Sequence, residues 1–245
     1  MKKKTKIIIT VVLAVLVVSL LALYLVPMFL LREATRKVLP EATRAEYITD
    51  FEIKRENTTE VDNGSYTIQV PGDLLKQEVN EDVKVNSYAS ENEETKILML
   101  TEAFSEEMTL LNPEDYENDP TMKRFGIKNV EKMFESLGYA RPDSYYNILK
   151  GICLLDWNDY NMLSIRKSVA FSIYAYLRTE LTMNAENYLY ERDNVRAIIQ
   201  KGKEPNIHID LFCTDDLNGA YTILVHGEDM TLEEVTAMLN TVEFK

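Results

Sequence analysis

Residues 7–31, IIITVVLAVLVVSLLALYLVPMFLL, contain no charged side chain and follow a short segment, residues 1–6, that carries four lysines. At about 1.5 Å per residue, a helix of this length reaches roughly 37 Å, which exceeds the ~30 Å hydrocarbon core of a bilayer. The sequence therefore predicts a single transmembrane anchor over residues 7–31, preceded by a short tail, residues 1–6.

A cleaved signal peptide is the alternative interpretation of this segment. The apolar region of a signal peptide normally spans about 7 to 15 residues and ends in small residues at a cleavage site. Here the apolar run is longer, and the part from Ser19 to Leu31 lacks a convincing pair of small residues. An uncleaved signal anchor is therefore favoured, with Pro27 near its outer end, where a kink is tolerated.

The charges that flank the anchor predict its orientation. Arg32, Arg36, Lys37 and Arg44 follow it and nearly balance the leading lysines. The leading charges lie on a very short segment, and large domains that follow an anchor translocate largely regardless of charge. We therefore expect a cell-membrane protein with a cytoplasmic N-terminus and an extracytoplasmic C-terminal domain.

The chain beyond the anchor is acidic. The whole chain carries −13, and residues 1–31 contain four lysines and no acid, so residues 32–245 carry −17. Such a charge repels phosphate backbones, so no nucleic acid is expected as a partner. The partners that the sequence predicts are the membrane, through residues 7–31, and an unidentified protein.

The glycine spacing excludes two nucleotide-binding motifs. The eight glycines are never closer than eight positions apart. The motifs G-x-G-x-x-G and G-x-x-x-x-G-K both need closer glycines, which let the backbone approach a phosphate. Nucleotide sites of these two types are therefore excluded, and we expect no nucleotide partner. The sequence predicts no cofactor.

Apolar patterns divide the remaining chain into a stalk and one domain. Residues 32–46 mix both charges and predict a juxtamembrane stalk that is interrupted before Pro40. Residues 47–245 predict a globular domain. Phe51 and Ile53, the turn signal at 62–64 and the alternation over 66–70 predict a hairpin. Further strands are predicted over 83–89, 95–104, 187–192, 195–201, 206–213 and 220–226.

Helical periodicity predicts an insertion at about 113–182. A helix near 130–137 stops at Gly138, a second is capped by Asp143 or Ser144, and a third spans about 162–182. The third carries two apolar lines, which predicts packing on two sides. Thr231 and Glu234 predict a capping box at the start of a closing helix.

This order of elements predicts an α+β fold, with a mainly antiparallel sheet and helices packed on its faces. The segments YTIQVPGD (66–73) and TLEEVTAMLNTVEF (231–244), together with the closing hairpin, resemble the PsbP-like family, named for an extrinsic subunit of photosystem II. The resemblance covers residues 48–104 and 186–245. It implies an α/β/α sandwich with an accessory role and no shared catalytic residue, although the helical block at 113–182 is longer than in that family.

His208 and His226 are the only histidines, which excludes an H-E-x-x-H zinc hydrolase. A hairpin register that places Ile209 opposite Val225 also places His208 opposite His226, with Asp210 two positions along the same face. Two imidazoles and a carboxylate would form a metal site. The favoured interpretation is two histidines without a metal, so these three residues are candidates only.

Other chemical patterns are weaker. Ser164 and Lys167 match S-x-x-K, but Ser164 equally predicts a helix cap. The acids at 114, 115, 117 and 119 lack the calcium-loop spacing, which favours a solvated loop. Trp157 is interpreted as a core anchor rather than a carbohydrate contact. Asn57 and Asn63 begin glycosylation sequons, which matter only in a eukaryotic source.

The two cysteines allow two interpretations. In an extracytoplasmic domain Cys153 and Cys213 would be able to pair, closing a loop of about 60 residues. Each lies in an apolar run, GICLLDW or HIDLFC, which favours two small buried hydrophobic residues instead.

The sequence thus predicts a non-catalytic, membrane-anchored extracytoplasmic domain that binds a protein or assists another one. The first alternative is a membrane-tethered hydrolase that uses carboxylates such as Asp156, Asp159 or Glu180. The second is a small-ligand or metal sensor built on the histidine hairpin.

Overall fold

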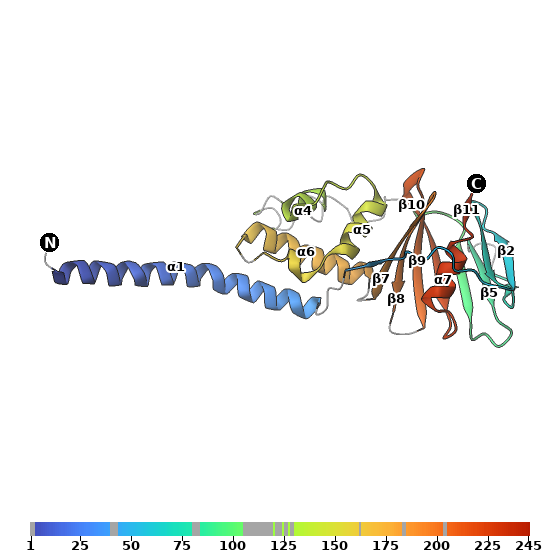
Figure 1. The fold of residues 1–245 in the computed structure, drawn as a ribbon, viewed down its shortest axis with the longest axis horizontal. Coiled ribbons are helices and arrows are strands. Elements are labelled where there is room, and N and C mark those ends of the chain that lie inside the picture. Colours follow the sequence, from blue (N-terminus) through green and yellow to red (C-terminus); the bar gives the residue numbers. More distant parts are fainter. Residues whose placement is uncertain are drawn as a thin grey trace.

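The computed structural model describes residues 3–39, 44–79, 84–104, 120, 124, 127, 130–161, 163–182, 185–202 and 205–245. Three parts follow one another along the molecule: a long N-terminal helix, a part made of helices and a part made of strands (Figure 1). The protein is therefore an α+β protein with one N-terminal apolar helix, as the sequence predicts.

Helix α1 (Lys3–Val38) runs without a break through the apolar segment and into the predicted stalk. It is long and apolar enough to cross a membrane. Pro27 lies inside it, and the helix ends two positions before Pro40, because a residue that precedes proline is disfavoured in helical geometry.

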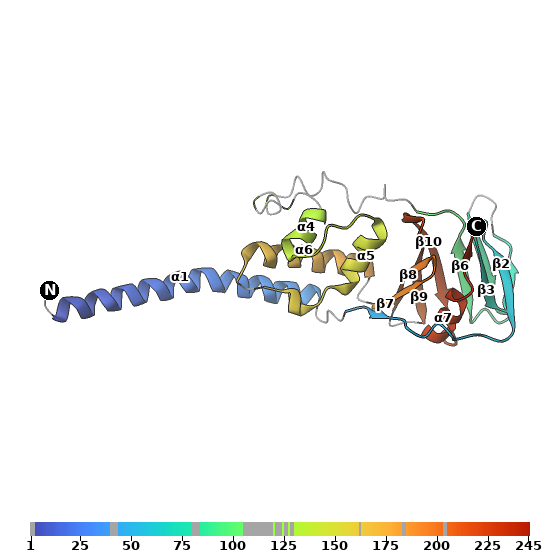
Figure 2. The same cartoon turned by 45° about the horizontal axis from the view of Figure 1, so that its top comes forward.

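The C-terminal end of α1 packs along α6 (Ile165–Thr182), and both helices run in the same direction (Figure 2). Tyr24 and Leu31 are partly buried, while Met28, Thr35 and Leu39 are buried, so one stripe with a spacing of three to four residues faces the helical part. This spacing is the one that keeps a single helix face turned toward a neighbouring helix.

The helical part has its own apolar core. Gly138 ends α4 (Val130–Leu137) with a φ of 93°, as predicted, because this backbone region favours glycine. Ser144 caps α5 (Tyr145–Leu154), and its Oγ accepts a hydrogen bond from the Asn147 amide. As predicted, α6 packs on more than one side, against α1, α4 and α5. The elements are α4 (Val130–Leu137), α5 (Tyr145–Leu154), the short helix η1 (Trp157–Asp159) and α6.

The larger sheet contains eight described strands in the order β1-β7-β8-β9-β10-β6-β5-β4. Among these strands β1 pairs with β7 in parallel and every other neighbour is antiparallel. In that order the strands are β1 (Glu46–Tyr47), β7 (Glu186–Arg192), β8 (Val195–Lys201), β9 (Asn206–Cys213), β10 (Asp216–His226), β6 (Lys96–Leu100), β5 (Val85–Ala89) and β4 (Leu75–Gln77).

A smaller sheet and α7 (Leu232–Leu239) cover one face of the larger sheet. The smaller sheet has the order β11-β3-β2, formed by Glu243–Phe244, Tyr66–Pro71 and Thr58–Asp62. The main apolar core lies between these layers, and a second cluster lies between α5 and the opposite face. The sheet therefore has helices on both faces.

Two local predictions change in the structure. The first strand of the N-terminal hairpin is β2, close to the turn, whereas Phe51 and Ile53 lie outside any strand. Helix α7 (Leu232–Leu239) is capped by Thr231, whose Oγ1 accepts from the Glu234 amide at 3.2 Å. The Glu234 carboxylate pairs with Arg55, and this ion pair explains why it does not complete the predicted capping box.

We expect Asn63→Ala to destabilise the protein. The Asn63 side chain is buried, donates to the Leu100 carbonyl at 2.9 Å and accepts from Asn86 at 2.7 Å, so it joins the β2–β3 turn to the larger sheet. Its loss leaves both partners unpaired, which costs about 2 kcal/mol and lowers the melting temperature by about 4 to 8 °C. Circular dichroism of the full chain in detergent measures this shift.

The exposed Thr59 on β2 supplies the control for this substitution. Thr59→Ala changes the melting temperature by no more than about 2 °C, as exposed positions usually do. Equal shifts for the two variants would show that the buried hydrogen bonds of Asn63 contribute nothing.

Candidate functional site

The predicted register of the histidine hairpin is wrong by two positions. Ile209 pairs with Ile223, and His208 faces Leu224 rather than His226, which pairs with Asn206. An irregular stretch between Asp216 and Tyr221 adds residues to one strand only and shifts the register. Both histidines remain on one face of the sheet, because a shift of two positions preserves the face.

The polar groups beside the histidines are bound to one another rather than arranged around a metal. His208 Nε2 lies 3.1 Å from Asp210 Oδ1, and His226 Nδ1 lies 2.6 Å from Asn206 Oδ1. Within the described residues, no group of three or more His, Cys, Asp or Glu side chains is placed to hold a metal ion. The three predicted candidates do not form a metal centre there.

The predicted carboxylates are engaged in local structure. Asp156 caps η1, and Arg44 binds both acids: its Nε lies 2.5 Å from Asp156 Oδ2 and its Nη2 lies 3.6 Å from Asp159 Oδ1. Trp157 stacks beside Phe171 with ring centroids 5.1 Å apart, which agrees with a core anchor. The side chain of Glu180 lies outside the described residues.

The remaining sequence candidates have structural roles or lie outside the description. Ser164 caps α6, since its Oγ accepts from the Lys167 amide at 3.4 Å. Both cysteines are free, and burial raises the pKa of the Cys153 thiol to about 12, so it is a poor nucleophile. Asn63 is buried and hydrogen-bonded, whereas Asn57 is exposed. The acidic positions 114, 115, 117 and 119 lie outside the described residues.

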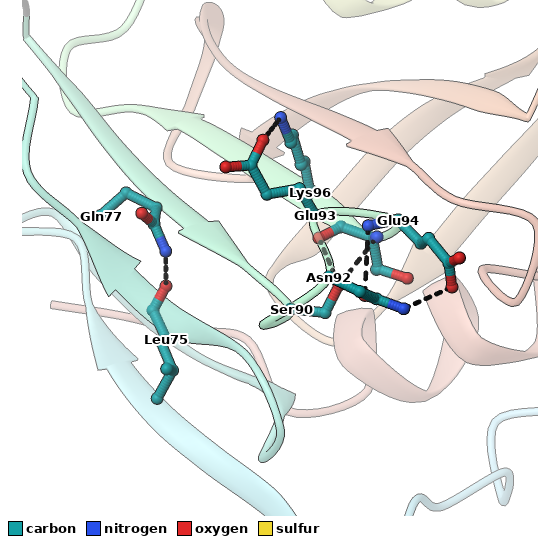
Figure 3. A network of polar contacts seen from close by, with 8 residues as sticks. Leu75, Gln77, Ser90, Asn92, Glu93, Glu94 and Lys96 are labelled. Atoms are coloured by element: carbon teal, nitrogen blue, oxygen red, sulfur yellow. Dashed lines mark hydrogen bonds and ion pairs between the residues drawn. The ribbon is translucent and has the colours of Figure 1, made fainter.

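The turn between β5 and β6 gathers several polar side chains (Figure 3). Ser90 Oγ donates to Asn92 Oδ1 at 2.7 Å, and Asn92 Nδ2 donates to Glu94 Oε2 at 2.5 Å. Lys96 pairs with Glu93 at 2.8 Å. The groups that approach one another belong to the turn and to the first residue of β6, so their contacts stabilise the loop.

A pocket of about 290 Å³ lies between α7, the end of β7 and the segment that precedes β2. Its apolar lining comes mainly from Phe51, Ile53 and Met238. Three cationic side chains also line it: Lys54, Arg55 and Arg192. The uncharged polar residues of the lining are Thr58, Gln69, Asn240 and Thr241.

Hydrogen bonds hold the walls of this pocket in place. Asn240 Nδ2 donates to the Ile53 carbonyl at 2.8 Å, and Tyr190 Oη donates to Asn240 Oδ1 at 3.0 Å. Arg192 Nη1 donates to the Phe51 carbonyl at 3.2 Å, and its guanidinium lies 6.0 Å from the centroid of the Phe51 ring. The extended segment at 51–55 is thus fixed to both β7 and the end of α7.

The pocket combines an apolar floor with a cationic edge. Arg55 pairs with Glu234, and Arg192 pairs with the exposed Asp193, so both positive charges are partly balanced. Its lining residues include no carboxylate, histidine or cysteine. Such a lining suits an apolar group that carries a carboxylate, because guanidinium groups bind carboxylates through paired N–H donors.

Sequence reasoning missed this pocket. Its lining comes from residues 51–58, Gln69, Arg192 and 237–241, four segments that only the fold brings together. Comparison of the chain with protein-family models and with curated proteins finds no match. The binding properties of the pocket are therefore inferred from its lining residues alone.

We expect the His208–Asp210 pair to make the stability of the fold depend on pH. Burial disfavours the charged imidazole, but the hydrogen bond and the charge of Asp210 outweigh it and raise the pKa of His208 above its usual value. A raised pKa stabilises the fold fully below pH about 6.5, and this contribution is lost as the pH rises through the folded-state pKa.

The imidazole proton signals measure this effect in an NMR titration of the full chain. Asp210→Asn removes the acceptor charge while the burial remains, so the pKa of His208 falls. The variant His226→Gln assigns the two histidine signals. An unchanged titration of His208 in Asp210→Asn would contradict the assigned cause.

Proposed function

We propose that this protein is a non-catalytic accessory module that one uncleaved helix anchors in the cell membrane, with its folded part outside the cytoplasm. The observation that carries the proposal is the continuity of α1 with the folded part: the apolar helix extends into a packed seam on α6 without a flexible break. An anchor of this kind fixes the position of the sheet part relative to the bilayer.

The pocket beside α7 is the proposed contact for a protein partner. Its cationic side chains stand out in a region, residues 32–245, that carries −17. They favour a partner segment in which an acidic side chain lies beside an apolar one, because Lys54 and Arg192 attract the former and the floor around Met238 accommodates the latter.

The PsbP-like sandwich remains part of this proposal. Its support is a mainly antiparallel sheet with α7 on one face and α5 on the other, the strand at Tyr66–Pro71 that ends in Val-Pro, and a chain that closes with strand β10, α7 and β11. The helical part would then be an addition that docks the sandwich onto its anchor.

A small-ligand sensor is the second candidate function, and the size of the pocket favours it. About 290 Å³ lies at the lower end of the range for small-molecule sites. A small apolar carboxylate would fit the same side chains as the partner segment. The hydrolase alternative finds less support, because Arg44 binds both Asp156 and Asp159.

The proposed topology predicts protease accessibility in intact cells. Added protease digests residues 32–245 without permeabilisation, because the folded part lies outside and offers exposed loops. A cytoplasmic protein in the same cells is the control and stays intact. Protection of residues 32–245 until the membrane is opened would contradict the topology.

The proposed partner contact predicts a position-specific photocrosslink. A benzoylphenylalanine at position 54, on the edge of the pocket, forms one discrete adduct with a protein in intact cells. Arg192→Glu reduces the adduct about tenfold, because it replaces an attraction by a repulsion worth more than about 1.4 kcal/mol. Arg192→Lys keeps the charge and retains most of the adduct.

Position 76 supplies the control for background crosslinking. Lys76 is an exposed lysine on the edge strand β4, remote from the pocket lining. Adducts of equal yield from positions 54 and 76 would contradict a specific protein partner. Loss of the position 54 adduct on addition of a small apolar carboxylate, with no protein adduct at other pocket positions, would favour the sensor.

A further inference from the structure

The free apolar length of α1 is shorter than the apolar run in the sequence. Among the described residues, the first hydrogen bond from α1 to the helical part is made by Tyr24, whose hydroxyl donates to the Leu163 carbonyl at 2.9 Å. Residues 7–23 precede this contact, and seventeen residues of helix reach about 26 Å. A hydrocarbon core of about 30 Å therefore extends to the level of Tyr24 or slightly beyond it.

Leu163 lies at this same level and is strongly exposed. Its side chain is 81% accessible, the largest exposed fraction among the large apolar residues of the described chain. The turn that presents it is ordered by hydrogen bonds: the Leu163 amide donates to Asn161 Oδ1 at 2.9 Å, and the Ser164 amide donates to the Asn161 carbonyl at 3.1 Å. The exposure of Leu163 is thus built into the turn.

The neighbouring contacts fix this turn to the anchor. Tyr160 Oη donates to the Met28 carbonyl at 2.9 Å, and Thr35 Oγ1 lies 2.6 Å from Ser172 Oγ. From Tyr24 to Thr35 along α1, the partner changes from Leu163, just before α6, to Ser172 within α6. Leu163 therefore lies at the end of the helical part that is nearer the N-terminal half of α1.

We propose that the turn around Leu163 rests in the outer interface of the bilayer that α1 crosses, with the Leu163 side chain among the upper acyl chains. This inference rests on the proposed membrane anchoring. Tyr24 then occupies the interfacial level at which tyrosine is enriched, and Arg166 and Lys167, which follow in the first turn of α6, lie at the level of the headgroups.

Spin-label accessibility tests the proposal on the full chain in vesicles of phosphatidylcholine and phosphatidylglycerol. A nitroxide is attached at Leu163→Cys in a Cys213→Ser background. Cys213 is partly exposed and is therefore replaced, whereas Cys153 is buried and unreactive and is kept. We expect relaxation by dissolved oxygen, which concentrates in the acyl region, to exceed relaxation by a water-soluble nickel chelate. The ratio of relaxation by oxygen to relaxation by the nickel chelate is then higher at position 163 than at positions that face bulk water.

Tyr176→Cys is the matched control, since Tyr176 is 56% exposed and lies thirteen positions further along the chain, within α6. At position 176 we expect relaxation of the nitroxide by the nickel chelate to exceed relaxation by oxygen. Equal ratios at positions 163 and 176 would overturn the proposal. Protection of position 163 from both reagents would also overturn it, because a protein surface would then cover the turn.

A label at Leu20→Cys separates this inference from the anchoring on which it rests. Leu20 lies in the apolar part of α1 and is 61% exposed. If oxygen dominates at position 20 and the nickel chelate at position 163, α1 spans the bilayer and the proposed turn contact alone fails. If the nickel chelate dominates at position 20, the membrane anchoring itself fails, and the inference with it.

Discussion

The seam between α1 and α6 is the contact on which the arrangement of this molecule depends. Before Tyr24, α1 has the composition of a helix that is surrounded by lipid; after it, one stripe meets the helical part while Arg36 and Lys37 remain exposed. The seam is partly polar, because Thr35 and Ser172 meet at 2.6 Å. Small hydroxyl residues allow two helices to approach closely, and the bond between them fixes the register along the seam.

Local signals predicted the helical part well. Gly138 and Ser144 act within one turn of their own positions, so the end of α4 and the start of α5 could be located from the sequence. The burial of one α1 stripe was hidden, because a fully apolar segment shows no contrast between its lipid-facing and protein-facing sides. Its only signal was the small set of polar residues, Tyr24 and Thr35, at helical spacing.

Long-range pairing set the limit of prediction in the sheet. The type and number of the closing strands were predictable from alternation, but the partner of His208 is Leu224, two positions from the predicted His226, because the number of extra residues in the irregular stretch after Asp216 has no signal in the sequence. The pairing of β6 with β10 joins residues more than a hundred positions apart. The pocket beside α7 was equally hidden, because the net charge of −17 averages over the cations that the fold gathers at Arg55 and Arg192.

The parallel course of α1 and α6 also sets the distance between the pocket and the N-terminal half of α1. Contacts progress from Tyr24 with Leu163 to Val38 with Thr179, so α6 leads away from the N-terminal half of α1. Its eighteen residues span about 27 Å before the chain enters β7. The Debye length is about 8 Å in physiological salt, so in the proposed membrane orientation anionic headgroups would exert little force on the acidic sheet part at this distance. In the proposed orientation the cations of the pocket would likewise be too distant to bind lipid headgroups, so the proposed partner segment would meet no competition from the bilayer.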